Sequence, residues 1–469
     1  MLPARRGKPR LYGNSSIATK SNALPVKLET DHRNLFLQLS IEKLIYGGDG
    51  LARLPADERG PGKAVFVPFV LPGERVEASL LEEKPGFARA RAESILAPSA
   101  QRIPPRCPYF LRCGGCHYQH AAYEHQLEIK AAILKENLRR IAKLELDTEL
   151  QIHPSPPWNY RNRSRLRVRT VPEFALGYNK FGSHELLAVE ECPISSPLIN
   201  RAIATLWHAG REGKVPEGLQ EVEFFANAED TQLLIEGYCL PESRAEALKT
   251  WAQEVRTTLP EVAGLAFFRQ AAMRVATTSE PELLAVVGTG ELVYQTSPAS
   301  YRVSAGVFFQ VNRHLINQLV TVVTAEHSGR TGLDLYAGVG LFSSALSQKF
   351  ERVVAVESSP SSCADLERNA PANVKTIRAT VEQYLKDVAG RTKPDFVVVD
   401  PPRSGLGVNV TRSLAVLGAP RLTYVSCDPA TLARDLGGLL AGGYRVQQAH
   451  LVDLFPQTYH LETVFQLVR

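Results

Sequence analysis

The sequence predicts a protein of three folded parts, of which the last is a Rossmann-like, doubly wound α/β domain. The 469 residues exceed the about 250–300 that a single hydrophobic core organises. From about Thr331 onward, strand, glycine loop and helix alternate, which is typical of a doubly wound sheet. Nearer the amino terminus, short runs of alternating apolar residues favour a small β-barrel. We expect a barrel at 34–99, a mixed α/β central domain at 100–295 and the doubly wound domain at 296–469, preceded by a basic disordered tail at 1–33.

The composition is that of an ordinary globular protein, with 44% hydrophobic and 22% charged residues. No apolar run approaches the about 20 residues of a membrane span, and the amino terminus lacks the apolar core of a secretory signal. We therefore expect a cytoplasmic protein without membrane contact, and nothing in the sequence indicates a protein partner. Residues 1–34 hold seven Lys or Arg and two acidic residues, which accounts for the whole net charge of +5. Such a tail either grips phosphates loosely or is simply solvated.

The barrel is predicted from residues 35–41, where Leu and Ile alternate with polar residues, and from a glycine-rich turn at 47–50. A helix is expected over 123–143, because apolar residues recur there at helical spacing. This helix is a candidate to pack on the carboxyl-terminal domain.

A small-residue loop opens the doubly wound domain. Residues 332–340, GLDLYAGVG, run from an apolar strand into a turn where only glycine lets the backbone approach a ligand closely. Nucleotide-binding and structural turns share this pattern. The next strand ends in Glu357, 23 positions after Asp334, where a carboxylate can accept hydrogen bonds from ribose hydroxyls. Because the loop does not match GxGxxG, the two features together favour S-adenosylmethionine over NAD.

Two later strands end in chemically useful side chains. The strand at 395–400 ends at Asp400, followed by Pro401-Pro402-Arg403, and the strand at 421–426 leads into Cys427. Ligands of open α/β sheets bind beyond the carboxyl ends of strands, so Asp400 and Cys427 should face one crevice with Glu357. Buried cysteines at strand ends are often inert, whereas a thiol in a turn before Asp-Pro is reachable and open to polarisation.

These segments resemble the motifs of the RNA uracil-C5 methyltransferase family, which includes the 23S rRNA enzymes and the tRNA T-loop enzyme. The matching segments are 308–312 (FFQVN), 334–340 (DLYAGVG), 400–403 (DPPR), 426–435 (SCDPATLARD) and 453–462 (DLFPQTYHLE). The resemblance implies that S-adenosylmethionine is bound by Gln310, Tyr336, Glu357 and Asp400, that Cys427 is the nucleophile and that Glu462 is the base. One departure is Ala337, where many relatives have cysteine, and we expect it to alter only the packing of the loop.

The expected chemistry explains these residue types. Carbon 5 of uracil is a poor nucleophile. When a thiolate adds to carbon 6, the ring becomes an enolate in which carbon 5 is nucleophilic. A carboxylate then removes the carbon-5 proton. Asp400 and Arg403 are expected to orient the base, with a plain salt bridge as the alternative for Arg403. The base must leave its stack; Phe308 is a candidate stacking surface, or else a core residue, and His460 is expected to pack or form a hydrogen bond.

Four cysteines form a separate candidate site. Cys107, Cys113 and Cys116 lie close together beside Gly114 and Gly115, and Cys192 is a plausible fourth ligand. Four thiolates suit a [4Fe-4S] cluster or a structural zinc. The close glycines favour iron–sulfur, and the resemblance implies it, because ribosomal-RNA members of the family carry such a pattern with a [4Fe-4S] cluster. The spacing is not that of radical S-adenosylmethionine enzymes. The remaining thiols, Cys239 and Cys363, are expected to be core or surface residues.

Arginine occupies every second position from 161 to 169. The residues are Arg161, Arg163, Arg165, Arg167 and Arg169. On a strand this period places all five on one face, as a basic stripe suited to phosphates; the alternatives are a protected edge strand or pairing with acidic neighbours. The barrel resembles the TRAM domain, a small RNA-binding domain of OB type, which would add a second contact to RNA.

The sequence therefore predicts methylation of uracil C5 in 23S rRNA through a covalent adduct between Cys427 and carbon 6. One alternative is the same reaction on the tRNA T-loop, where the barrel and the cysteines are less expected. Another is a non-catalytic iron–sulfur RNA-binding protein, against which the intact Cys427 and Glu462 argue.

Overall fold

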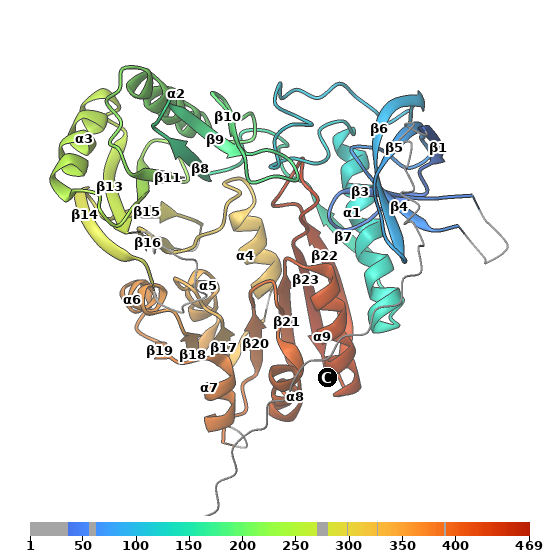
Figure 1. Ribbon diagram of the computed structural model, residues 1–469. Helices are drawn as coiled ribbons and strands as arrows, with labels where there is room; N and C mark the ends of the chain where they lie inside the picture. The colour runs from blue at the N-terminus through green and yellow to red at the C-terminus, as the bar shows by residue number, and fades with distance from the viewer. Residues whose placement is uncertain (1–35, 56–61, 270–279, 298, 326, 389–390) are drawn as a thin grey trace, which may run out of the picture.

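In the computed structural model, the described residues form three large sheets with their covering helices and one two-stranded sheet (Figure 1). The described residues are 36–55, 62–269, 280–297, 299–325, 327–388 and 391–469. The basic tail expected at 1–33 lies outside them. Within the described part, no helix combines the length and apolar character that crossing a bilayer would require.

The amino-terminal part is a six-stranded sheet in the order β1-β5-β6-β4-β3-β2. The strands are β1 (Phe36–Ser40), β2 (Lys43–Leu44), β3 (Asp49–Arg53), β4 (Ala64–Pro68), β5 (Arg75–Glu83) and β6 (Phe87–Ala97). Alternate residues point into a small apolar core that includes Ala52, Val65 and Val76, each fully buried. The predicted glycine turn joins β2 to β3. Gly48 has φ +97°, and a Cβ there would lie 3.1 Å from His117, so this turn packs against the cysteine-rich segment.

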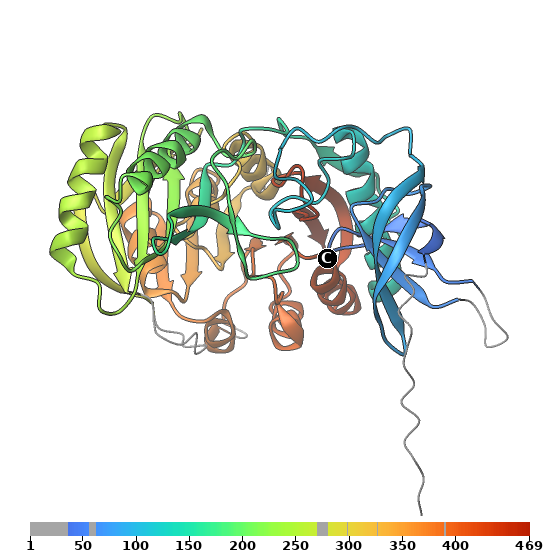
Figure 2. The ribbon, with the colours of Figure 1, turned by 45° about the horizontal axis from the view of Figure 1, so that its top comes forward.

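The central part is a seven-stranded sheet in the order β10-β9-β8-β11-β12-β13-β14. Its strands are β8 (Arg163–Arg169), β9 (Ala175–Asn179), β10 (Leu186–Ala188), β11 (Leu219–Ala226), β12 (Leu233–Cys239), β13 (Val262–Arg269) and β14 (Glu282–Gly288). Helices α2 (Pro197–Arg211) and α3 (Ala245–Thr258) pack on the sheet through an apolar core that contains Leu206, Phe224 and Trp251. In Figure 2 this sheet and the barrel lie at opposite ends of the molecule.

The arginine-rich strand β8 lies inside this sheet, between β9 and β11, so the edge-strand alternative is wrong. The prediction of a single exposed stripe is also wrong, because Arg163 is 7% exposed and its guanidinium bonds to Glu223 of β11 and Glu236 of β12. Arg165 is half-exposed and pairs with Glu221 at 2.5 Å. Pairing with acidic neighbours, the second alternative, therefore describes the first half of the strand.

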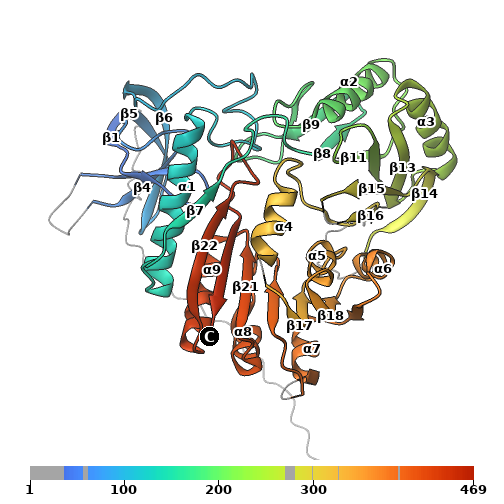
Figure 3. The same cartoon turned by 180° about the vertical axis from the view of Figure 1, so that it is seen from behind.

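The carboxyl-terminal part is an eight-stranded sheet in the order β19-β18-β17-β20-β21-β23-β22-β7 (Figure 3). Its strands are β7 (Leu150–His153), β17 (Gly329–Leu335), β18 (Phe350–Glu357), β19 (Val374–Arg378), β20 (Phe396–Val399), β21 (Arg421–Ser426), β22 (Arg445–Val452) and β23 (Thr463–Val468). Its helices are α4 (Ile316–Thr324), α5 (Leu341–Ser347), α6 (Pro360–Asn369), α7 (Val381–Val388), α8 (Gly407–Leu417) and α9 (Pro429–Ala441). A hairpin of β15 (Glu291–Gln295) and β16 (Ser300–Ser304) precedes the sheet. Strands β17 to β21 are parallel, as a doubly wound domain requires, and β23 runs antiparallel to β21 and β22.

The helix expected over 123–143 forms as α1 (Tyr123–Asn137), extended by a π-helical turn at Leu138–Ala142. Its apolar side chains, Ile129, Ile133 and Leu134, share one buried core with residues of α9 and the eight-stranded sheet. Strand β7 follows and pairs in parallel with β22 at the edge of that sheet. Two elements that precede the central sheet in the chain thus belong structurally to the carboxyl-terminal domain.

We predict that Arg163 serves stability rather than RNA contact. Replacing Arg163 with Met should lower the free energy of unfolding by about 3–5 kcal/mol, because Glu236 and Glu223 would lose their buried partner. Arg169→Ala, at an exposed position of the same strand, should change it by no more than about 0.5 kcal/mol. Urea denaturation followed by circular dichroism measures both. Equal effects of the two variants would contradict the assignment.

Candidate active site

A cavity of about 710 Å³ opens at the carboxyl ends of β17, β18, β20 and β21. The residues predicted for catalysis or cofactor binding all line it: Gln310, Tyr336, Glu357, Asp400, Arg403, Cys427 and Glu462. We call it the active-site cavity. The strand-end rule for open α/β sheets explains why segments so far apart in sequence meet there.

The glycine loop between β17 and α5 forms one wall of this cavity. Tyr336, Gly338 and Gly340 all have positive φ, at 64°, 56° and 94°. A Cβ at Gly338 would meet no atom within 4 Å, so this wall leaves open space beside a backbone that only glycine adopts readily. The Gly338 amide donates to the Glu357 carboxylate at 2.9 Å, and the amides of Ser358 and Ser359 donate to its other oxygen at 2.7 Å. The carboxylate is thereby fixed at the cavity, and its Oε2, which accepts only the Gly338 bond, keeps one lone pair for a ligand's hydroxyl group.

Asp400 directly follows β20, and its amide donates to the Leu335 carbonyl at 3.3 Å. Burial, together with the negative charge of Asp334, raises the pKa of Asp400 to about 7. Burial also raises the pKa of Asp334 to about 7, although its carboxylate accepts a 2.5 Å hydrogen bond from the Ser343 hydroxyl. Asp400 at the cavity and Asp334, which is fully buried, are therefore both partly protonated at neutral pH.

Cys427 lies in the turn between β21 and α9, where its side chain is partly exposed to the cavity. Asp428 caps α9 by accepting from the amides of Ala430 and Thr431, which fixes the turn. The Tyr46 hydroxyl, from the barrel, donates to the Cys427 carbonyl at 3.2 Å. Burial raises the pKa of the Cys427 thiol to about 12; the carboxylates of Glu462 and Asp400 add to the rise and the Arg403 guanidinium opposes it. The thiol is therefore protonated at neutral pH in the free protein.

Glu462 immediately precedes β23, whose first residue, Thr463, pairs with Ser426 of β21. This register places Glu462 next to Cys427, the residue after Ser426. The Glu462 carbonyl accepts from the Val452 amide at 2.9 Å, and its side chain is buried. Burial, reinforced by the Asp400 charge and opposed by Arg403, raises the pKa of Glu462 well above its ordinary value.

Three further side chains line the active-site cavity. Phe308 is 67% exposed, so the core alternative for it is wrong, while its neighbour Phe309 is buried. His460 packs its ring against Tyr459 and Phe455, with centroids 4.3 and 5.6 Å away. Burial and the Arg403 charge lower the pKa of His460 to about 3, so it is neutral. Packing, the expected role for His460, is what the structure shows.

A second cavity, of about 340 Å³, adjoins the first and shares Arg161 and His460 with it. The four predicted cysteines, Cys107, Cys113, Cys116 and Cys192, line it, and we call it the cysteine cavity. Burial raises the pKa of Cys113 to about 11 and also raises that of Cys107 and Cys116. Over the described residues, no group of three or more His, Cys, Asp or Glu side chains is placed to hold a metal ion. Cys239 and Cys363 are buried thiols in β12 and α6, away from this cavity.

Some residues at the site were not predicted from sequence. Arg161 was expected to contact phosphates along a strand, and it instead precedes β8 and lines both cavities. Asp334 was used only as a spacing mark, because burial of a carboxylate at a strand end leaves no local signal. Tyr46 belongs to the barrel, 381 residues from Cys427 in sequence, and no motif marks it.

The fold is that of an S-adenosylmethionine-dependent methyltransferase. It matches the crystal structure of the Pyrococcus abyssi tRNA (uracil-54, C5)-methyltransferase in complex with S-adenosyl-L-homocysteine, with a TM-score of 0.71 and 23% identity. That match covers 92% of this chain and 99% of the other. Residues 122–469 match the profile of the tRNA (Uracil-5-)-methyltransferase family, and residues 37–92 match the TRAM domain.

Curated relatives agree with these matches. An uncharacterized RNA methyltransferase of Aquifex aeolicus is 35% identical over 436 residues, covering 91% of this chain and 97% of the relative. The 23S rRNA (uracil(1939)-C(5))-methyltransferase RlmD of Chromohalobacter salexigens is 34% identical over 438 residues, covering 92% of this chain and 89% of the relative. The chain therefore belongs to the tRNA (uracil-5-)-methyltransferase family and carries an amino-terminal TRAM domain. The resemblance seen in the motifs is confirmed.

We predict that Cys427 in the free protein reacts slowly with iodoacetamide at neutral pH. Its alkylation rate should rise about tenfold per pH unit from pH 7 to pH 9, because the thiolate is the reactive form and its fraction grows tenfold per unit below the pKa. Mass spectrometry of the Cys427 peptide measures the rate. A rise of only about threefold between pH 8 and pH 9, as expected for an ordinary thiol with a pKa of about 8.5, would contradict the raised pKa.

Proposed function

We propose that this protein methylates carbon 5 of a uridine in 23S ribosomal RNA, with S-adenosylmethionine as methyl donor and Cys427 as covalent nucleophile. The observation that carries the proposal is one cavity that is lined both by Cys427, Glu462 and Asp400 and by the glycine loop and Glu357. A methyl donor and a target base can react only where the residues that bind each of them line the same space.

The residues of the donor wall fit S-adenosylmethionine. The open space beside Gly338 and the anchored carboxylate of Glu357 suit an adenosine and its ribose hydroxyls. Tyr336 and Gln310 line the same cavity. When bound, the donor supplies an electrophilic methyl group on a sulfonium, whose positive charge would favour ionisation of the nearby Cys427 thiol.

The reaction would then follow from the placement of Cys427 and Glu462. The Cys427 thiolate adds to carbon 6 of the uracil, and carbon 5 uses the resulting electron pair to bond the methyl group while the sulfonium carbon–sulfur bond breaks. Glu462, as a carboxylate, removes the proton from carbon 5. The electrons of that bond reform the carbon 5–carbon 6 double bond as the Cys427 sulfur leaves.

Other side chains would hold the target base in its flipped position. Phe308 presents an exposed ring to the cavity, as a stacking surface for an unstacked base requires. Asp400 and Arg403 lie beside Cys427, where a carboxyl group and a guanidinium can bond to the polar edge of uracil. Asp400 and Arg403 would thus surround the enolate that forms when the Cys427 thiolate adds to carbon 6.

The assignment to 23S rRNA rests on the RlmD relatives, which match over most of the chain. The tRNA T-loop is the second candidate substrate, because the Pyrococcus abyssi protein with the same fold is a tRNA (uracil-54, C5)-methyltransferase. Its 23% identity supports the fold alone. A non-catalytic RNA-binding protein is the remaining alternative, and the complete set of side chains around Cys427 argues against it.

We predict that Cys427→Ala abolishes tritium release from 5-tritiated uridine RNA and that Glu462→Gln traps a covalent complex. Without the thiol no adduct forms, whereas without the base the methylated adduct cannot resolve. Tritium counting on 23S rRNA and on tRNA, together with denaturing gels of enzyme and RNA, measures both effects and ranks the substrates. Cys363→Ala, which removes a buried thiol of α6, is the control. Full tritium release by Cys427→Ala would refute the mechanism, and cofactor binding without turnover on either RNA would favour the non-catalytic alternative.

We further propose that the cysteine cavity holds a [4Fe-4S] cluster. Four thiols line one space, and the Gly115 amide donates to the Cys113 sulfur at 3.4 Å, the kind of contact that thiolate ligands of a cluster accept. Bound there, the cluster would join residues 107–116 to Cys192 and stabilise the wall shared with the active-site cavity.

We predict that the protein purified without oxygen, or reconstituted with iron and sulfide, carries about four irons per chain. Cys192→Ala should lose most of this iron and the broad visible absorption of the cluster, because one of four ligands is missing. Cys239→Ala, a buried thiol of the central sheet, should keep both. Stoichiometric zinc in place of iron, or equal iron in the two variants, would rule the cluster out of this cavity.

A further inference from the structure

We infer that Lys130 of α1 is a positioning residue for the step in which the carbon-5 proton is removed. Its ion pair with Asp453 fixes the loop 453–462, which joins β22 to β23 and carries Phe455, His460 and Glu462 to the active-site cavity. This inference rests on the proposed function, because it assigns Lys130 a part in the work of Glu462.

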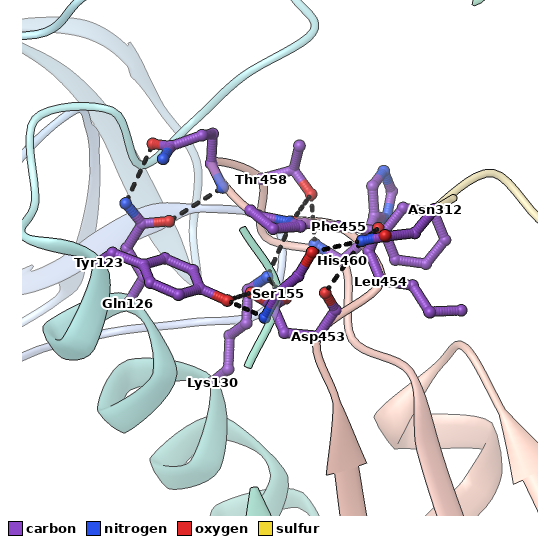
Figure 4. Close-up of polar contacts among 12 residues, drawn as sticks. Tyr123, Gln126, Lys130, Ser155, Asn312, Asp453, Leu454, Phe455, Thr458 and His460 are labelled. Carbon is purple, nitrogen blue, oxygen red and sulfur yellow. Dashed lines mark hydrogen bonds and ion pairs between the residues drawn. The ribbon is translucent and has the colours of Figure 1, made fainter. Parts of the chain in front are cut away.

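The ion pair is short and excluded from solvent. The Lys130 ammonium donates to Asp453 at 2.6 Å, and the two side chains are 0% and 1% exposed. The ammonium also donates to the Phe455 carbonyl at 2.9 Å, and the Tyr123 hydroxyl donates to the second Asp453 oxygen at 2.9 Å. Figure 4 shows these bonds converging on the start of the loop from α1. Every strong bond of Lys130 therefore goes to loop 453–462.

A buried ion pair of this kind is poorly explained by stability alone. Moving both charges out of water is costly, and apolar residues of similar size often stabilise a fold equally well. Such a pair does fix a definite geometry, because a buried charge is stable only beside its counter-ion. Here that geometry concerns a loop and not the sheet, whose strands are held by their own ladders.

A backbone hydrogen bond couples the position of Asp453 to that of Glu462. The residue before it, Val452, donates its amide to the Glu462 carbonyl at 2.9 Å, so the two ends of the loop are bonded to each other. Asn312 donates to the Leu454 carbonyl at 3.1 Å and links the loop to the segment that bears Phe308 and Gln310. A displacement at Asp453 would therefore be transmitted to Glu462 through the Val452 amide, while Asn312 keeps the segment that bears Phe308 and Gln310 in place.

Helix α1 also binds the middle of loop 453–462. Gln126, one turn before Lys130 on α1, exchanges two hydrogen bonds with Gln457, at 2.9 and 3.0 Å. The Gln457 carbonyl accepts from the amides of His117 and Tyr118, next to the cysteine cavity. Since Gln457 has φ +69°, its backbone needs such support.

These contacts predict a selective kinetic effect. Cys427 is held separately, by the turn between β21 and α9, so addition to carbon 6 does not depend on the Lys130 pair. Proton removal does, because the Glu462 carboxylate must reach the carbon-5 proton of an adduct already fixed by its sulfur. A misplacement of about 1 Å can cost about 100-fold in such a step.

The test is a single-turnover comparison of adduct formation with adduct resolution in Lys130→Met. Enzyme, 5-tritiated uridine RNA and S-adenosylmethionine are mixed, and the covalent complex on denaturing gels is followed alongside tritium release. Adduct formation should stay within about twofold of wild type while resolution slows at least about tenfold, so the complex accumulates. Lys135→Met, at an exposed position on the same helix, is the matched control and should behave as wild type.

Two further variants keep the test decisive if Lys130→Met folds poorly. Tyr123→Phe removes one bond to Asp453 without touching the charges and should slow resolution in the same direction by a smaller factor. Lys130→Met with Asp453→Asn removes both charges, which should restore folding and leave resolution slow. Wild-type resolution in Tyr123→Phe and in the folded Lys130 variants, with Glu462→Gln still trapping the adduct, would overturn the inference. Failure of Glu462→Gln to trap any adduct would overturn the proposed function instead.

Discussion

The site depends on one antiparallel pairing in a sheet whose neighbouring strands run the other way. Residues before β23 arrive at the edge where β17, β20 and β21 end, since β23 is antiparallel to β21. The Thr463 hydroxyl donates to the Ser426 carbonyl at 2.9 Å, 37 residues away in sequence, and this contact sets Glu462 beside Cys427. A parallel strand in the same position would have delivered its first residue to the opposite edge.

Burial is the second constraint, and it sets the protonation of the site. The same exclusion of water raises the pKa of Asp400 to about 7 and that of Cys427 to about 12. Arg403 is the cation that opposes both the Cys427 and the Glu462 shifts. Under the mechanism proposed for Cys427 and Glu462, a nucleophile that stays protonated until the sulfonium donor binds would be protected from alkylation in the free protein. A base with a raised pKa would accept a carbon-bound proton more readily once it is ionised.

The strand-end rule explains how much of the site could be predicted from sequence. The glycine loop, Asp400 and Cys427 all follow apolar strands, so their convergence was predictable. Glu462 precedes a strand, and only the family resemblance suggested it. Arg163 was misread because its partners, Glu223 and Glu236, come from other strands. The TRAM domain and the doubly wound domain were predicted in kind, whereas the iron–sulfur character of the central domain stays a prediction. The pairing of β7 with β22 was not predicted, because a four-residue strand carries too little periodicity.

The parts that precede the doubly wound domain do more than surround it. The TRAM domain reaches Cys427 through Tyr46, the cysteine-rich segment reaches loop 453–462 through His117, and α1 reaches it through Lys130. These are contacts to backbone carbonyls or to a buried charge, which fix position and leave the reacting side chains free. Catalytic groups on a strand-end turn and a loop need such support, because a rate falls steeply with small errors in placement. The amino-terminal elements therefore belong to the active site in the physical sense, although no reacting atom comes from them.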